Sequence, residues 1–163
     1  MPREATVALR PARDADVTFI VEMARHACVI EDRPLPDRED PEVLAMLPPR
    51  GEVALLAHDR ASGDPLGAVW TWHADPPLQV DAQGSSVPEL CIAVAPTRRG
   101  AGIGGLLLDG LFLEKALTLD ALCANVHVRN PARRLYERKG FDPVGQGRGP
   151  LGLAMVKDLR RPG

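Results

Sequence analysis

The residues that point most directly to chemistry lie in the stretch "PTRRGAGIGGLLLDGL", from Pro96 to Leu111. Four glycines fall within the six residues from Gly100 to Gly105, after two arginines and before a leucine-rich run. Glycine lets a backbone approach a ligand closely, and the first N–H groups of a helix are unpaired donors at a positive dipole end. The stretch therefore predicts a phosphate-binding turn between a strand and a helix.

Two well-known phosphate-binding motifs account poorly for these glycines. A Walker loop needs a lysine directly after them, and none follows. Gly100, Gly102 and Gly105 do satisfy the dinucleotide motif GxGxxG, but only 58 residues follow Gly105, too few for a doubly wound sheet. Asp120, the candidate ribose-binding acid, also precedes its strand. A nicotinamide-binding oxidoreductase stays an alternative with weaker support, and a turn that serves only close packing is another.

Two motifs together resemble the signatures of the GNAT superfamily of N-acetyltransferases. The stretch "AVAPTRRGAGIG" resembles the acyl-CoA loop [Q/R]xxGx[G/A], whose fixed positions are filled by Arg99, Gly102 and Gly104. The stretch "VRNPARRLYERKGF" resembles N-x-x-A-x-x-L-Y-x-x-x-G-F, with Ala132 one place before the motif's small residue. The matching residues of this second motif are Asn130, Leu135, Tyr136, Gly140 and Phe141. The resemblance extends over nearly the whole chain and is weakest in residues 1–50 and 75–87.

The resemblance implies a binding site for acetyl-CoA as the cosubstrate, without a metal. Main-chain amides from Arg99 to Gly105 would bind the pyrophosphate, and Arg98 or Arg99 would add a charge contact to a phosphate. The strand "ELCIAV" would splay from its neighbour and pair its free backbone groups with the pantetheine arm. The expected cofactor-binding residues are Ile92, Ala93, Val94, Arg98, Arg99, Gly100, Ala101, Gly102, Ile103, Gly104, Gly105, Asn130 and Tyr136.

Two residues are the catalytic candidates that the resemblance implies. Tyr136, the chain's only tyrosine, falls at the superfamily's tyrosine, which protonates the departing thiolate; otherwise it would pack on the sheet. Glu89 begins the "ELCIAV" strand and would be the general base, often through water; otherwise it is a polar residue at a strand end. Asn130 is first a helix cap and second a cofactor contact.

The elements that must position these residues follow an α/β order. We expect a central mixed, mostly antiparallel sheet of about seven strands with about four helices, in a single N-acetyltransferase domain over residues 1–163. Asp14 is expected to cap the first helix. The helix after the glycines is expected to bury one stripe, made of Ile103, Leu106, Gly110, Leu113 and Leu117. The expected strands cover residues 6–11, 52–58, 65–73, 88–94, 121–128, 141–144 and 151–159.

The bulk composition narrows the class of protein. The formal net charge is −2, so composition gives no indication of nucleic-acid binding. No apolar run approaches the ~20 residues of a membrane span, and the beginning "MPREATVALRP" has no signal-peptide core. Three widely spaced cysteines are typical of buried thiols in a reducing cytoplasm, and four histidines lack metal-ligand spacing. We therefore expect a cytoplasmic protein without a metal, a nucleic-acid partner or a membrane partner.

The acceptor is the least determined part of the prediction. The stretch "IEDRPLPDREDPE" has six acids and could attract a cationic amine, although a solvated loop is the simpler interpretation. Trp70 and Trp72 share one strand face and could line a pocket for an aromatic or apolar acceptor, belong to the core, or cover a dimer contact. Arg148 could meet an acidic acceptor or be solvated. We expect direct acetyl transfer to a primary amine of a small molecule or peptide in a ternary complex, because no nucleophile is placed for a covalent step. A non-catalytic acyl-CoA-binding module is the alternative. A homodimer is compatible with this class, but no pattern marks an interface.

Overall fold

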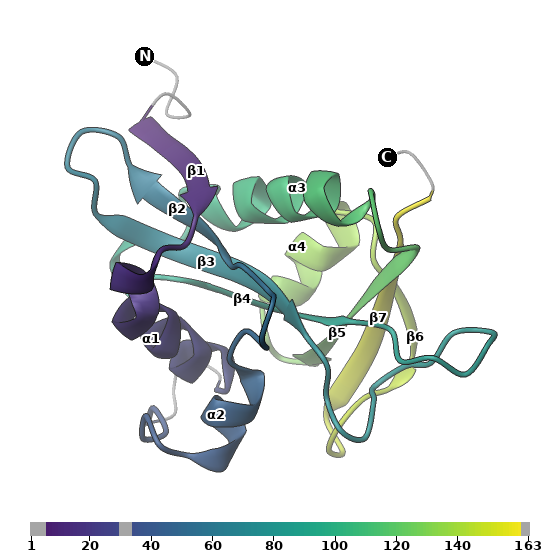
Figure 1. Cartoon of the computed structure of the whole chain (residues 1–163). Helices are drawn as coiled ribbons and strands as arrows, with labels where there is room; N and C mark the ends of the chain where they lie inside the picture. Colours follow the sequence, from purple (N-terminus) through teal and green to yellow (C-terminus); the bar gives the residue numbers. More distant parts are fainter. Residues whose placement is uncertain (1–5, 30–33, 161–163) are drawn as a thin grey trace.

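A computed structural model describes residues 6–29 and 34–160 of the chain (Figure 1). It contains seven strands and four α-helices within these ranges. The strands are β1 (Val7–Pro11), β2 (Leu55–Asp59), β3 (Pro65–Trp72), β4 (Glu89–Val94), β5 (Ala121–His127), β6 (Asp142–Gln146) and β7 (Gly152–Asp158). The helices are α1 (Val17–Ala27), α2 (Pro41–Met46), α3 (Ile103–Lys115) and α4 (Ala132–Arg138).

The strands form one mixed sheet in the order β1-β2-β3-β4-β5-β7-β6. Every neighbouring pair is antiparallel except β4 and β5, which are parallel and are connected through α3. Hairpins join the early strands, and a strand–helix–strand crossover follows, as the order of sequence patterns predicted. The predicted mixed, mostly antiparallel sheet with four helices is confirmed.

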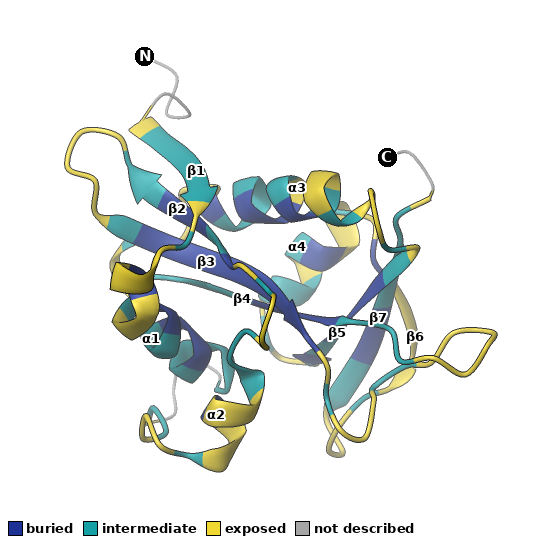
Figure 2. Cartoon of the chain, viewed as in Figure 1, coloured by how far each residue is buried: buried dark blue, intermediate teal, exposed yellow. Residues whose placement is uncertain are grey.

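Helices cover both faces of the sheet, so its central strand is buried on both sides. Helices α1 and α2 lie on one face, while α3 and α4 lie on the other (Figure 1). Seven of the eight residues of β3 are buried, from Leu66 to Trp72 (Figure 2). Alternate residues of β3 therefore belong to two separate apolar clusters, one on each face of the sheet. Val69 packs in the cluster under α3, and Trp70 packs in the cluster on the opposite face, with α1 and α2.

Helix α3 buries a different stripe from the predicted one. Ile103 and Gly110 do face the sheet, and a Cβ on Gly110 would come within 2.8 Å of Leu9 and Leu55. The fully buried positions are Ile103, Leu107, Leu108 and Leu111. Leu113 is 78% exposed and Leu117 is 84% exposed, so their predicted burial is wrong. The helix ends at Lys115, before Leu117, and every face of this leucine-rich sequence offers apolar residues, so spacing alone could not select the inner one.

The start of the first helix also differs from the prediction. Asp14 does not cap it, because residues 14–16 form a short 3₁₀ turn and α1 begins at Val17. The structural carboxylate is Asp16, which accepts two hydrogen bonds from the Arg10 guanidinium at 2.7 and 3.0 Å and one from the Arg13 N–H at 2.7 Å. Asp16 thus fixes the chain as it passes from β1 to α1.

Asp16→Asn should lower the free energy of unfolding by about 1.5–3 kcal/mol at neutral pH, because it removes charge-assisted hydrogen bonds to Arg10. Arg10 lowers the pKa of Asp16 from its ordinary 3.8 to about 2. A lowered pKa stabilises the fold above the unfolded value, and this stabilisation is lost as pH falls through about 2. The difference from wild type, measured by urea unfolding, should therefore shrink in acid.

The control for this measurement is Asp14→Asn, which changes an exposed carboxylate of the same turn. It should leave the unfolding curve unchanged. Equal losses in the two variants would show that the turn needs negative charge in general rather than the Asp16–Arg10 pair.

Candidate active site

A cavity of about 620 Å³ lies where β4 and β5 part, between the first turn of α3 and helix α4. This volume is in the range of ligand pockets. All of the predicted site residues line it except Ala101. The structure thus brings together the glycine stretch, the splayed strand and Tyr136, which are far apart in the sequence.

The cavity exists because β4 and β5 form only one ladder pair, Glu89 with Cys123. On the other side, β4 pairs with β3 along its whole length. The Ala95 N–H donates to Leu66 of the β3 side, so by alternation Ala93 also turns its backbone groups toward β3, while Ile92 and Val94 turn theirs toward the gap. Of the three predicted strand residues, Ile92 and Val94 therefore have main-chain groups that can meet a ligand, and Ala93 offers only its side-chain surface.

The four glycines divide into two pairs with different roles. Gly100 and Gly102 have φ angles of +79° and +82°, and a Cβ on either would meet nothing within 4 Å, because both border open space. A Cβ on Gly104 would come within 3.0 Å of Leu135, and one on Gly105 within 3.4 Å of Lys139. The first pair shapes the turn, and the second lets α3 approach α4. The ligand-binding and packing explanations of the glycines each apply to one pair.

The first turn of α3 leaves main-chain donors available to a ligand. Gly102 is the residue before the helix and provides no side-chain cap. The N–H groups that open the helix are therefore not satisfied by a capping side chain. Of the adjacent arginines, Arg98 lies 3.6 Å from the Asp59 carboxylate, while the Arg99 Nε donates to the Val94 carbonyl at 3.4 Å. Arg99 thus lies over the gap, and Arg98 has an acidic partner on β2.

Both ends of α4 are held, and this fixes Tyr136 in the cavity wall. The Asn130 side-chain oxygen accepts the Ala132 N–H at 2.9 Å, which confirms its predicted capping contact. Gly140, at φ +93°, donates to Glu137, and the Phe141 N–H donates to the Tyr136 carbonyl at 3.0 Å, which together form a Schellman motif. The Tyr136 ring packs 5.4 Å from the Phe141 ring.

Tyr136 is 7% exposed, and its hydroxyl has no hydrogen-bond partner among residues 6–29 and 34–160. Burial raises its pKa well above the ordinary value, and the nearby Cys91 and Glu89 raise it further. Cys91 and Glu89 stand on the α1 face of β4, whereas Tyr136 belongs to the cluster on the α3 face. The phenol therefore remains protonated at neutral pH.

Glu89 is buried, at 4% exposure, and both its oxygens are engaged. The Arg148 guanidinium donates two hydrogen bonds to them, at 2.8 and 2.5 Å. Arg148 lies on the β6–β7 loop, with its guanidinium carbon 5.6 Å from the centre of the Trp72 ring. Trp72 faces Glu89 directly across the β3–β4 ladder. Arg148 therefore pairs with Glu89, a contact that the sequence did not predict, while its side chain remains 40% exposed to solvent.

Two further residues of the site were not predicted. His26, from the last turn of α1, lines the cavity, and burial lowers its pKa, so that the ring stays neutral at pH 7. Asn125, on β5, lines the cavity and accepts the Arg148 main-chain N–H at 2.9 Å. Only the three-dimensional arrangement of α1, β5 and the β6–β7 loop reveals these residues, because none belongs to a motif.

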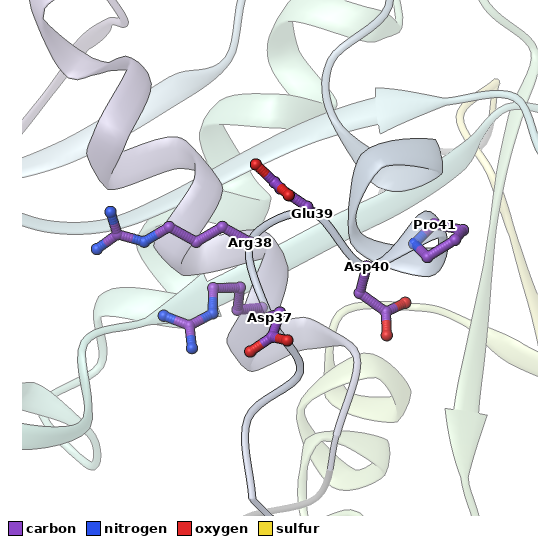
Figure 3. Close-up of a pocket in the computed structure, with 6 residues that line it drawn as sticks. Asp37, Arg38, Glu39, Asp40 and Pro41 are labelled. Carbon is purple, nitrogen blue, oxygen red and sulfur yellow. The ribbon is translucent and has the colours of Figure 1, made fainter.

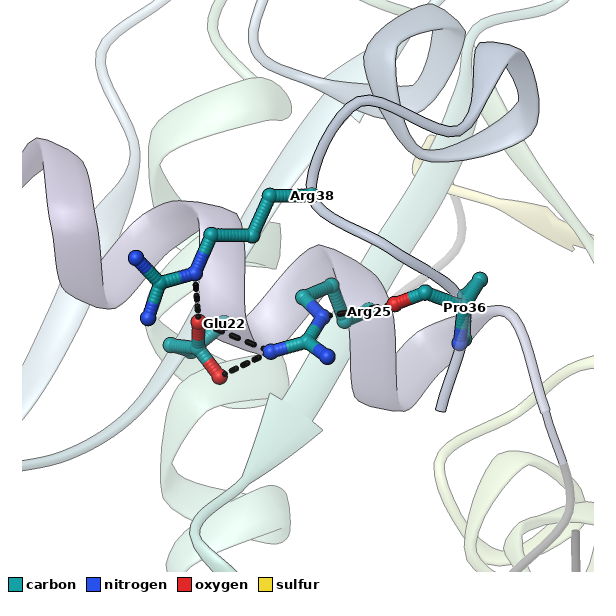
Figure 4. A network of polar contacts seen from close by, with 4 residues as sticks. All are labelled: Glu22, Arg25, Pro36 and Arg38. Atoms are coloured by element: carbon teal, nitrogen blue, oxygen red, sulfur yellow. Dashed lines mark hydrogen bonds and ion pairs between the residues drawn. The ribbon is translucent and has the colours of Figure 1, made fainter. Parts of the chain in front are cut away.

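The acid-rich segment before α2 forms a separate polar hollow of about 650 Å³. Figure 3 shows residues 37–41 on this segment, and Arg25 of α1 completes the lining. Both arginines of the hollow are paired with Glu22 of α1, which accepts from Arg25 at 2.9 Å and from Arg38 at 2.8 Å (Figure 4). Asp40 caps α2 through the Glu42 N–H. In its described part, this segment therefore supports the interpretation as a solvated loop.

The cysteines are poor nucleophiles at neutral pH. All three are free thiols, with Cys91 and Cys123 buried. Burial raises the pKa of Cys28 and of Cys123 to about 12, and that of Cys91 well above its ordinary value. Among the described residues, no group of three His, Cys, Asp or Glu side chains could hold a metal ion. The helices in the described ranges are also too short or too polar to cross a membrane.

Comparison with known proteins identifies the family. A model of the acetyltransferase (GNAT) domain matches residues 50–143. Similar solved structures include a GCN5-related N-acetyltransferase from Kribbella flavida, 24% identical, which covers 95% of this chain and 99% of that chain with a TM-score of 0.69. Another is yncA from Salmonella typhimurium with its cofactor acetyl-CoA, 21% identical, covering 94% of each chain with a TM-score of 0.68.

A third similar structure is the spermidine N-acetyltransferase from Vibrio cholerae in complex with CoA and spermine, 20% identical, covering 96% of this chain and 97% of that chain with a TM-score of 0.66. No curated protein matches the sequence. The family model covers more than half of the chain, and the sheet, the parted strands and the two motifs agree with it. The resemblance seen in the sequence is therefore confirmed, and the chain belongs to the GNAT acetyltransferase family.

Proposed function

We propose that the chain transfers the acetyl group of acetyl-CoA directly to a primary amine within a ternary complex. The observation that carries this proposal is the cavity at the parted strands, which has unpaired helix donors at one side and a buried, protonated phenol in its wall. The neutral, buried thiols support direct transfer, since none is prepared to form an acyl-enzyme.

The residues present fit coenzyme A. The open space before Gly100 and Gly102, which a Cβ would enter, suits the close approach of a diphosphate to main-chain N–H groups. The main-chain groups that Ile92 and Val94 turn toward the gap suit an amide-containing arm that continues the sheet, once the Arg99 Nε releases the Val94 carbonyl. When bound, acetyl-CoA supplies an activated thioester, and an N–H of β4 would polarise its carbonyl oxygen.

Tyr136 holds the proton that the departing thiolate requires. Its raised pKa keeps the hydroxyl protonated, and its lack of a partner leaves the O–H free to donate. Burial also keeps bulk water from competing as a donor. Tyr136 is therefore assigned as the general acid.

Glu89 is assigned as the general base, acting on the amine directly or through water. Its pairing with Arg148 means that the acceptor or a water molecule must compete for its oxygens. His26 is a second candidate, because it lines the same cavity and its lowered pKa keeps it neutral and able to accept a proton. Separate Glu89→Gln and His26→Asn variants would distinguish the two through the acid side of the pH–rate profile.

The proposed activity predicts that acetyl-CoA binds and that free thiol appears when a suitable amine is added. Calorimetry with acetyl-CoA and a thiol-release assay over a panel of amines would test both parts. Binding without turnover on any amine would favour the alternative, a non-catalytic acyl-CoA-binding module. Protection against melting by NAD instead of coenzyme A would favour a nicotinamide-binding protein.

Tyr136→Phe should lower kcat roughly 100-fold or more, because it removes the general acid. The phenylalanine ring keeps the packing against Phe141, so the melting temperature and the Kd for acetyl-CoA should change little. Steady-state kinetics, calorimetry and thermal unfolding would be compared with wild type. Unchanged turnover would assign the proton to another donor.

Gly102→Glu should abolish acetyl-CoA binding, because it places bulk and negative charge at the start of α3. The matched control is Gly84→Glu in an exposed loop, where φ is +80° and a Cβ also meets nothing within 4 Å. Both variants carry about 1 kcal/mol of left-handed backbone strain. In calorimetry only Gly102→Glu should lose binding; retained binding would mean that the diphosphate lies elsewhere.

A further inference from the structure

The charged groups around the cavity divide between the turn proposed to bind the cofactor and the start of β4. Among the described residues, the lining of the cavity includes four arginines and a single carboxylate, that of Glu89. The arginines are Arg98, Arg99, Arg129 and Arg138. The one carboxylate is already neutralised by Arg148. Arg98 also pairs with Asp59, and Arg98 and Arg99 flank the glycine turn that is proposed to bind the phosphates of coenzyme A, so the charged groups left to meet the acceptor are those of the Glu89–Arg148 pair.

Within the Glu89–Arg148 pair, Glu89 lines the cavity, and the Arg148 side chain reaches Glu89 from beside it. Glu89 lines the cavity on the α1 face of β4, and the Arg148 main chain is bound to Asn125, which lines the same cavity. The Arg148 side chain is 40% exposed, whereas that of Glu89 is 6% exposed. The guanidinium can therefore exchange its partner with solvent or ligand, while the buried carboxylate needs a replacement cation before it can be released.

We propose that the acceptor is a free α-amino acid, which inserts into this pair so that its carboxylate binds Arg148 and its ammonium group binds Glu89. The inference rests on the proposed acetyl transfer and specifies its substrate class. A zwitterion of this kind satisfies both partners of the pair at once, so no buried charge loses its counter-ion. The ammonium group is brought next to the carboxylate that would take its proton.

Three features around the Glu89–Arg148 pair bear on this exchange. The Trp72 ring lies against the Arg148 guanidinium and can hold its plane while the carboxylate partner changes. The Trp72 indole N–H is buried and is the one side-chain donor or acceptor in the described residues that is fully enclosed without a partner. The planar fork of Arg148 binds carboxylates in two parallel hydrogen bonds, as it does with Glu89.

The main chain of the β6–β7 loop is anchored to β5, and this keeps Arg148 beside Glu89. A Cβ at Gly147 would overlap the Asn125 side-chain oxygen, so only glycine allows the contact that holds the Arg148 main chain. Gly149, at φ +72°, completes the turn back to β7. The side chain can move while the backbone that carries it remains fixed.

The test compares each amino acid with its amide and its decarboxylated amine in the thiol-release assay. Wild type should show a kcat/KM at least tenfold higher for the amino acids. Arg148→Gln should reduce that preference to near unity, mainly through KM, and Arg148→Lys should retain part of it. Arg133→Gln, which removes an exposed arginine from the outer side of α4, is the charge control and should retain the preference.

Arg148→Gln leaves a buried carboxylate unpaired and could destabilise the fold, so a second comparison removes that charge. In the presence of CoA, calorimetry would compare amino-acid binding to Glu89→Gln with binding to the double variant Glu89→Gln/Arg148→Gln. Preference for the acid over the amide should persist in the first and vanish in the second.

The outcomes separate this inference from the proposed function. Turnover on amines without any preference for the carboxylate, or a preference that survives loss of Arg148, would overturn the inference alone. Arg148-dependent amino-acid binding without turnover on any amine would overturn the acetyl transfer and leave the binding site standing. Neither turnover nor binding of amino acids would overturn both.

Discussion

The site depends on one interruption of the sheet, the parting of β4 and β5 after a single pair. A sheet normally satisfies the main-chain groups of its inner strands, and a buried strand that loses a neighbour must find other partners. Here β4 remains paired with β3 along its full length, so β4 stays a regular strand. The main-chain groups of Ile92 and Val94 on its other edge face the cavity. The fold thus turns main-chain hydrogen-bonding groups of a regular strand, rather than of a loop, toward the gap.

The parting also connects the two faces of the sheet. Glu89 and Tyr136 belong to opposite layers, and in a continuous sheet the strands would separate them. The charge of Glu89 nevertheless contributes to the raised pKa of Tyr136. In the proposed function, an acceptor from the α1 side and a cofactor from the α3 side would meet within the sheet, between Glu89 and Tyr136. This geometry suits direct transfer between two bound substrates.

The sequence could predict the features that depend on local residue identity. Gly102 needs a positive φ, Asn130 must cap a helix, and Gly140 must end it, so each leaves a signal in the sequence. What could not be predicted depends on contacts between distant segments. The Arg148 guanidinium binds Glu89, which lies 59 positions away in the chain, and the sequence around either residue gives no sign of this contact. The buried stripe of α3 was mispredicted for a related reason, because its leucines surround the helix and the sheet alone selects a face.

The two halves of the site consequently differ in what they can vary. The cofactor half is built from main-chain groups at a helix start and a strand, and their geometry follows from the fold itself. The acceptor half is built from side chains on α1, the start of β4 and the β6–β7 loop, which the sheet positions but whose identity the fold does not require. A chain of this fold can therefore keep one cosubstrate while a single loop residue changes the acceptor. In the proposed function, the Glu89–Arg148 pair would make that choice, because it would set which charges an incoming amine must carry.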